Sequence, residues 1–385
     1  MLVLVRTCLA HISILLLVVA ATGVSEPDFV EVQSWQPPRT GWLYVIDATH
    51  EGSGARVFLF DAERGEIAGV IRTGYSPDVA LSARGDRLYV ASALFGCRQP
   101  NCDRLTVIDT RLGRVLSTTP IPNRVTYGTY PDASRMAVSA DGRTVYVLTW
   151  QGPPSGDAPV ALAAFDALRA RFLDGAIDLG PCGGGGFVPA TDDSHLGFLC
   201  PASNEAVFYR LTAPDRATFE FSVRLPWGKR LFAQHVYTDV SARAFMLSAD
   251  RRGLYVAGGD GAVSEVNLAL GSVRETLVPG DRNEVVAPFA SPGALEPARF
   301  YVAVGPYDGR GTAREIRVFD TNTWARLGTI RTSAPFRTGV ATKDGSVIYA
   351  LTANRAGVLA IDAVAQRELR AMPLGRAPSL ALIAP

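Results

Sequence analysis

The sequence predicts an all-β fold, a seven-bladed β-propeller, from three observations: a repeated phrase, the regular spacing of its copies and a last copy that is cut short. One half of the phrase runs Gly-x-x-Pro, a short apolar stretch, a Ser-x-Asp-Gly-like turn and an aromatic-rich strand. It is clearest from Gly74 to Val90 and returns from Gly128 to Leu148. The other half is a strand ending in an acidic residue, a turn and a further strand, as in Val107–Gly113. Repeats of this length indicate an array of similar small units.

The spacing of the central strands gives the number of units. Their aromatic residues recur at intervals of about 45 to 57 residues, which is room for four short antiparallel strands and their turns. This is the content of one propeller blade, and seven copies predict seven blades. The expected central strands are Leu43–Ile46, Arg87–Ala91, Thr144–Thr149, His195–Cys200, Gly253–Ala257, Arg299–Val304 and Val347–Thr352.

The two ends of the repeat region predict how the ring is closed. The first unit begins at Gly41 with no Gly-x-x-Pro strand before it, and the sequence from Gly375 to Ile383 reads as that strand with nothing after it. A ring built from a linear chain has two open sheet edges, which can template aggregation. We expect the C-terminal strand to complete the first blade. A solenoid would need polar caps at both ends instead.

The N-terminus reads as a signal peptide over residues 1–25. Arg6 supplies the positive region and Ile12–Ala20 the apolar region, followed by small residues at a cleavage site. A retained membrane anchor is the alternative, but this apolar run is shorter than the roughly 20 residues that span a bilayer. We expect a periplasmic protein without a stable membrane anchor, with a polar lead-in over residues 26–40 and the propeller over residues 41–385.

Charge and cysteine usage fit an exported domain. The formal net charge is only +1, so nothing indicates a nucleic-acid partner. Apart from Cys8 in the signal peptide, four cysteines allow three disulfide connectivities. The pairing by proximity is Cys97 with Cys102 and Cys182 with Cys200. A zinc site is the competing interpretation, but no histidine stands at a ligand-like spacing to either pair.

The sequence contains no recognisable catalytic motif. The Gly183–Gly186 run lacks the Lys-Ser/Thr that follows a phosphate-binding loop. The aspartates that close the blades recur, and an aspartate that ends a strand can accept hydrogen bonds from backbone N–H groups of the next turn. We therefore expect a structural role for them, and no catalytic group, cofactor or metal ion on this chain. These aspartates are Asp61, Asp109, Asp320 and Asp362.

Loops that enter the innermost strands carry large residues that do not repeat. Clustered aromatics on a rigid ring suit the docking of a partner. The alternative is that each side chain packs against its neighbouring blade. The candidates for this channel and partner face are Tyr75, Tyr127, Tyr130, Phe187, His235, Phe336 and Arg376.

Several of these segments resemble known families. The Tyr-Val-x-x, Val-Ile-Asp and Gly-x-x-Pro phrases are similar to YVTN-repeat propellers. A closer resemblance is to the heavy, β-propeller subunit of the methylamine and aromatic amine dehydrogenases. It rests on Arg124–Pro131, Met136–Gly142, the insert Gln151–Ala158, the Cys182 and Cys200 pair, and the Gly375–Pro378 ending.

This resemblance implies a function that needs a second chain. In that family the heavy subunit carries no redox cofactor, and a small disulfide-rich light subunit holds tryptophan tryptophylquinone. The quinone oxidises primary amines to aldehydes and ammonia, and electrons leave to a small periplasmic copper protein or cytochrome. The propeller would provide a docking platform and part of the substrate channel wall.

Some positions depart from the family pattern. Glu51, next to His50, matches the position where the family places an aromatic residue bordering the substrate channel. Cys97 and Cys102 look like an addition. Two further function classes therefore stay open: a stand-alone periplasmic propeller that binds a protein or other ligand, and a metal- or quinone-dependent enzyme acting alone.

Overall fold

The computed structural model describes most of the repeat region. Its described residues are 30–47, 55–94, 101–125, 135–139, 141–151, 159–180, 187–188, 194–200, 205–224, 245–247, 253–257, 263–267, 270–278, 284–290, 299–306, 312–342, 344–352, 357–374 and 380–383. Within these residues all regular elements are strands, and no helix is long and apolar enough to cross a membrane.

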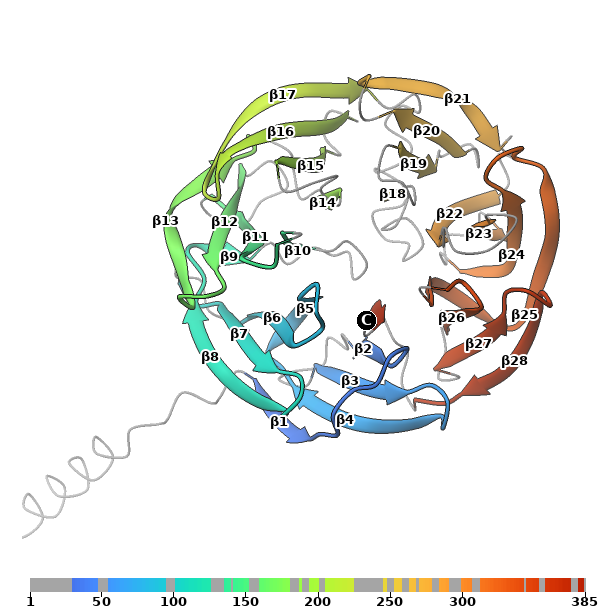
Figure 1. The fold of residues 1–385 in the computed structure, drawn as a ribbon, viewed down its shortest axis with the longest axis horizontal. Helices are drawn as coiled ribbons and strands as arrows, with labels where there is room; N and C mark the ends of the chain where they lie inside the picture. The colour runs from blue at the N-terminus through green and yellow to red at the C-terminus, as the bar shows by residue number, and fades with distance from the viewer. Residues whose placement is uncertain are drawn as a thin grey trace, which may run out of the picture.

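The described strands form six hydrogen-bonded sheets that stand around a common centre, as Figure 1 shows. The first sheet has the order β1(Glu31–Ser34), β4(Glu66–Arg72), β3(Arg56–Asp61), β2(Leu43–Asp47) and β29(Leu380–Ile383). The second is β5(Tyr75–Leu81), β6(Arg87–Ala93), β7(Arg104–Asp109) and β8(Arg114–Pro120). The third contains β9(Arg124–Val125), β10(Met136–Val138), β11(Thr144–Trp150), β12(Val160–Asp166) and β13(Arg171–Asp178).

The remaining sheets follow in chain order. The fourth is β14(Phe187–Val188), β15(His195–Cys200), β16(Glu205–Ala213) and β17(Arg216–Arg224). The fifth is β18(Phe245–Leu247), β19(Gly253–Ala257), β20(Val263–Asn267) and β21(Ser272–Val278). The sixth is β22(Glu284–Ala290), β23(Arg299–Pro306), β24(Ala313–Asp320), β25(Arg326–Ala341), β26(Val347–Thr352), β27(Val358–Asp362) and β28(Arg367–Met372).

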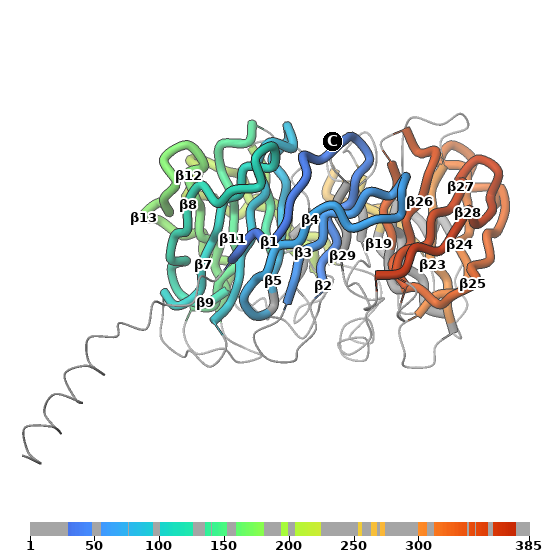
Figure 2. The backbone as a smooth tube through the Cα atoms, turned by 90° about the horizontal axis from the view of Figure 1, so that it is seen from below, coloured from blue at the N-terminus to red at the C-terminus, as the bar shows by residue number. Residues whose placement is uncertain are grey.

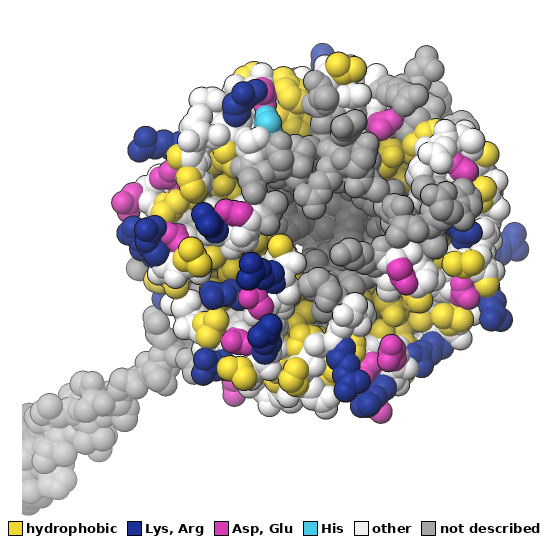
Figure 3. Space-filling model, viewed as in Figure 1, with side chains coloured by type: hydrophobic (Ala, Val, Ile, Leu, Met, Phe, Trp, Pro, Cys, Tyr) yellow, Lys and Arg dark blue, Asp and Glu magenta, His cyan; other side chains and the backbone are white. Residues whose placement is uncertain are grey.

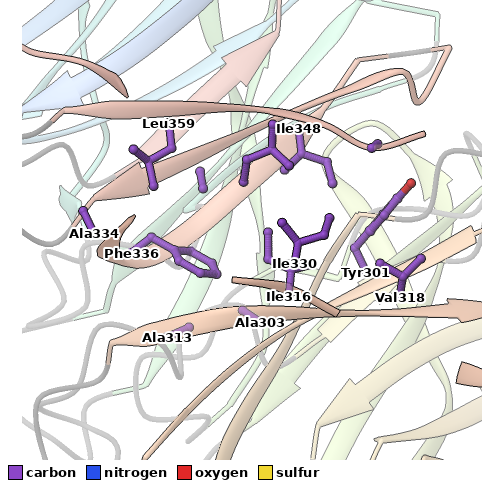
Figure 4. Packing of buried hydrophobic residues seen from close by; sticks show 13 residues of the cluster. Tyr301, Ala303, Ala313, Ile316, Val318, Ile330, Ala334, Phe336, Ile348 and Leu359 are labelled. Carbon is purple, nitrogen blue, oxygen red and sulfur yellow. The ribbon is translucent and has the colours of Figure 1, made fainter. Parts of the chain in front are cut away.

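The sixth sheet contains two sets of strands because β25 is continuous over 16 residues. Its first half pairs with β24 and its second half with β26. Residues from both sets meet in one apolar cluster, which includes Tyr301, Ile316, Phe336 and Ile348 (Figure 4). The two sets therefore pack face to face although one strand joins them.

Burial falls from the middle of each sheet to its outer edge. All seven residues of β11 are buried, whereas most of β8 and β28 is exposed. A strand buried on both faces reads as a short continuous apolar run, and the seven predicted central strands have this character. The structure confirms each of them as a strand: β2, β6, β11, β15, β19, β23 and β26.

The repeated aspartates make the predicted turn contacts. The Oδ1 atom of Asp61 accepts a hydrogen bond from the backbone N–H of Glu63 at 3.0 Å, and Asp109 accepts one from Arg111 at 2.9 Å. Asp320 and Asp362 bind the N–H two residues later in the same way. We call the face that carries these turns the turn face. The opposite face, where the chain enters the innermost strands, is the entry face. Figure 2 shows the ring from the side, with its two faces at the top and bottom.

Strand β1 and Trp35 extend the first sheet beyond the predicted start at residue 41. Strand β1 pairs with β4 at the outer edge, and the Trp35 indole N–H donates to the Thr110 carbonyl oxygen at 2.8 Å. Gly113 has a φ of +58°, and a Cβ atom there would lie 2.1 Å from the Trp35 ring. Residues 31–35 of the predicted polar lead-in therefore belong to the folded ring.

The last strands of the described chain contact the first sheet. Strand β29 pairs antiparallel with β2, from Leu43 opposite Ile383 to Ile46 opposite Leu380. The Arg370 guanidinium donates to the carbonyl oxygens of Ala62 and Glu63. Residues far apart in the sequence thus lie side by side.

Asp344 makes similar contacts in the turn between β25 and β26, and the acid dependence of stability tests them. A hydrogen bond from the Thr342 hydroxyl, with further ones from Ser346, holds the pKa of Asp344 below its usual value. A carboxyl group with a lowered pKa in the folded state stabilises the protein above its unfolded pKa and loses that effect as pH falls through the folded pKa. We expect Asp344→Asn to flatten the loss of unfolding free energy between about pH 5 and pH 2, measured by urea unfolding. Parallel pH profiles for variant and wild type would contradict this.

Candidate functional site

The structure describes some of the predicted site residues and not others. Tyr75, Phe187, Phe336, Cys102 and Cys200 lie in described strands or turns. The positions that lie outside the described residues, and stay predictions, are His50, Glu51, Tyr127, Tyr130, His235, Arg376, Cys97 and Cys182.

Phe336 is not available to a partner. Its side chain is 0% exposed and packs in the cluster between the two strand sets of the sixth sheet (Figure 4). Burying a phenylalanine in this way contributes about 1.5–3 kcal/mol. The expectation that it belongs to the channel and partner face is therefore corrected: the aromatic ring fills the space between neighbouring strand sets.

Tyr75 and Phe187 both lie at the entry-face ends of innermost strands. Tyr75 begins β5 opposite Ala93 and is half-buried. Phe187 begins β14 opposite Phe198. Of the predicted face residues that are described, Tyr75 is the one that lies near a group of buried charges.

Asp103 and Arg124 form the first half of this group. The Arg124 Nε atom lies 3.0 Å from the Asp103 Oδ2 atom, and the two side chains are 7% and 0% exposed. The same oxygen accepts the backbone N–H of Val125 at 2.7 Å. The other carboxylate oxygen accepts the N–H of Leu94 at 3.0 Å. The Asp103 carboxylate therefore links the residue that follows β6 to strand β9.

Asp78 and Arg135 form the second half, between the second and third sheets. The Asp78 Oδ1 atom accepts the N–H of Val79 at 2.9 Å, and Oδ2 accepts the N–H of Arg135. Both side chains are buried. The Arg135 guanidinium is attracted electrostatically to both Asp78 and Asp103. We call Asp78, Asp103, Arg124 and Arg135 the buried charge cluster.

Burial dominates the electrostatics of the cluster. Loss of solvent raises the pKa of Asp78, while the Arg135 charge and backbone N–H groups oppose this. The same loss of solvent lowers the pKa of Arg135, and the charges of Asp78, Asp103 and Tyr75 oppose it. Two acids and two bases balance in charge. Asp103 is paired with Arg124, and both carboxylates accept backbone N–H groups, which makes their burial tolerable. The arrangement suits support of the entry face rather than chemistry on a substrate.

The neighbourhood of Asp103 also contains left-handed backbone. Asn101 and Asn123 have φ angles of 62° and 63°, in the left-handed region. The Asn101 N–H donates to the Asn123 carbonyl oxygen at 3.2 Å, and the Asn123 N–H donates to the Asn101 side-chain oxygen at 3.3 Å. Cys102 lies between Asn101 and Asp103. Its predicted partner Cys97 is not described, so that pairing stays a prediction.

Sequence reasoning singled out Tyr75 and the segment that begins at Arg124 but not the acids and the second arginine of the cluster. The available signal was Asp78, a charged residue directly before the apolar run of an innermost strand. The pairing itself joins residues up to 57 positions apart, which no local pattern reveals.

Other charges are spread over the surface. On the face visible in Figure 3, Lys and Arg side chains alternate with Asp and Glu around the rim. His195 lies 3.0 Å from Glu220, measured from Nε2 to Oε2, and Arg210 pairs with the same carboxylate. Among the described residues, no group of three or more His, Cys, Asp or Glu side chains could hold a metal ion.

Comparison with known proteins finds a family match for the region around the cluster. Residues 40–173 match the family model of the methylamine dehydrogenase heavy chain (MADH). The resemblance to this heavy-chain family is confirmed. The matched residues include all four members of the buried charge cluster, from Asp78 to Arg135. A search of curated proteins finds no match.

Solved structures that are similar to the chain are β-propeller proteins. One is a functionally unknown protein from Desulfotomaculum acetoxidans DSM 771, with a TM-score of 0.63, 11% identity, and coverage of 90% of this chain and 99% of that chain. Another is the periplasmic gluconolactonase PpgL of Pseudomonas aeruginosa, with a TM-score of 0.60, 16% identity, and coverage of 90% of this chain and 99% of that chain. A third is the β-propeller domain of Cps50 (Swd1) from Myceliophteria thermophila, with a TM-score of 0.54, 12% identity, and coverage of 78% of this chain and 88% of that chain. At these identities the likeness shows the fold alone.

Removing one partner of the buried ion pair tests its role. We expect Arg124→Leu to lower the free energy of unfolding by about 3–5 kcal/mol, because it leaves a buried carboxylate without its cation. Arg169→Leu is the matched control: Arg169 is 71% exposed and lies 2.8 Å from Asp166, so its loss should cost less than about 1 kcal/mol. Equal effects of the two variants in urea unfolding would contradict the assignment of a buried pair.

Proposed function

We propose that this chain is the periplasmic, non-catalytic heavy subunit of an amine dehydrogenase whose quinone lies on a separate light subunit. The observation that carries the proposal is the family match over residues 40–173. That region contains both the buried charge cluster and the segment Arg124–Pro131, which resembles the family in sequence. Buried charges that hold the backbone of the entry face in place suit a docking subunit.

The proposed architecture is a ring of seven blades closed by β29. The seven central strands β2, β6, β11, β15, β19, β23 and β26 support the count. The pairing of β29 with β2 and the contacts of Arg370 with the first sheet support the closure. In a closed ring the innermost strands surround a channel, and their entry-face ends would meet the partner.

The proposed division of labour places the chemistry on the partner. Tryptophan tryptophylquinone on the light subunit would supply the oxidation of a primary amine, and a periplasmic copper protein or cytochrome would take the electrons. This chain would supply the docking face and part of the channel wall, with Glu51 and His50 as candidate wall residues. A carboxylate there would attract the ammonium group of the substrate. Export by the signal peptide and the disulfides Cys97–Cys102 and Cys182–Cys200 belong to the same proposal.

Purification of the tagged chain from the periplasm of its native host, grown on amines, tests the function. We expect a stoichiometric small subunit on denaturing electrophoresis and a quinone-like visible absorbance that bleaches when amine is added. A colourless single chain would contradict the proposal. That result would favour the alternative of a stand-alone YVTN-type propeller that binds a protein or other ligand.

A further inference from the structure

Asp103 joins three stretches of chain at the entry face. Its carboxylate accepts the N–H groups of Leu94 and Val125, and its backbone carbonyl accepts the N–H of Ile121 at 2.9 Å. Leu94 follows β6, while Ile121 and Val125 lie on either side of the turn that leads into β9. One residue thus sets the relative position of the second and third sheets at this face.

The exposed residues beside Asp103 adopt the left-handed backbone conformation. Asn101 and Asn123 are exposed, both have positive φ angles, and they hydrogen-bond to each other. Asparagine adopts the left-handed region more readily than other non-glycine residues, because its short polar side chain can hydrogen-bond locally. The bonds of Asp103 to Leu94, Ile121 and Val125 hold the chain beside this pair of asparagines.

Stability alone does not account for this arrangement. A buried ion pair such as Asp103 with Arg124 is a weak source of stability, because the desolvation of both charges offsets their attraction. Its carboxylate geometry, in contrast, is specific, since one oxygen binds the N–H group of the residue that follows β6 and the other binds an N–H group of β9. The cluster therefore determines where the backbone lies more than how firmly the ring folds.

We propose that Asp103 is a positioning residue for subunit assembly: it holds the entry-face backbone around Leu94, Asn101 and Val125 in the geometry against which the light subunit docks. This inference rests on the proposed function and adds to it the residue that prepares the docking face. Asp103 itself is 0% exposed, so it acts through the chain that it holds.

A charge-conserving substitution tests the inference. Asp103→Glu keeps the carboxylate and its pairing with Arg124, but it moves the oxygens by about 1.5 Å, one carbon–carbon bond. The two N–H groups can then no longer both be reached. We expect a dissociation constant for the native light subunit, purified from the complex, at least about tenfold higher than with wild type, equivalent to about 1.4 kcal/mol. The melting temperature should fall as well, because a buried N–H group is left unpaired, so the affinity is measured well below the melting transitions of both proteins.

Two more variants separate positioning from general destabilisation. Asp103→Asn removes the charge as well and should weaken binding further. Asp166→Asn is the matched control, because the Asp166 carboxylate also accepts two backbone N–H groups but lies on the turn face; it should leave light-subunit affinity unchanged. If Asp103→Asn does not fold, the comparison of light-subunit affinity between Asp103→Glu and Asp166→Asn still tests the positioning role.

The outcomes distinguish the two proposals. Wild-type affinity in Asp103→Glu would overturn the positioning role and leave the heavy-subunit function standing. A loss of affinity in Asp166→Asn equal to that in Asp103→Glu would also overturn it. Failure of the wild-type chain to bind any light subunit would overturn the proposed function, and the inference with it.

Discussion

The contact between the last strands and the first sheet is the interaction on which the rest of the structure depends. The first sheet and the last strand set bury apolar side chains against each other, so separating them would expose two apolar faces at once. One cluster joins Leu43, Val45 and Phe60 of the first sheet to Leu351 and Val358 of the last strand set. All five side chains are fully buried. In the closed ring that we propose, this contact would hold the two ends of the chain together.

The two faces of the ring are built on different principles. The turn face repeats one device, an aspartate whose carboxylate accepts the backbone N–H groups of the following turn. The entry face between the second and third sheets has a single arrangement that does not repeat, the buried charge cluster. Repetition suits a scaffold, whereas a set of buried charges found at one place fixes the backbone of one particular surface. This contrast is why we place the partner at the entry face.

Sequence reasoning predicts what the repeat carries. The seven central strands follow from short apolar runs with one aromatic residue, and the aspartate turns follow from their spacing. It did not predict β1, because Glu31–Ser34 is mostly polar and matches no copy of the repeat. The continuity of β25 is also invisible, since a strand that passes from one set to the next differs from two strands only by its missing turn.

The site was predicted less completely than the fold. A local pattern indicated Tyr75, and the family resemblance indicated the segment that begins at Arg124. Asp103 stands in a turn and looks like any exposed acid until the third sheet packs against it. Phe336 shows the opposite case: a large aromatic at the start of a loop-like stretch looked available, and packing of two strand sets buried it. In both cases the deciding contact is between segments far apart in the sequence.

The most direct test of the account is the melting temperature of a chain that lacks Ser379–Pro385 and therefore β29. If β29 completes the first blade and closes the ring, the whole protein should melt in one transition at a clearly lower temperature. A control that removes only residues 384–385, after the end of β29, should melt like the full chain. Identical melting of the full chain and of the chain without β29 would contradict the closure.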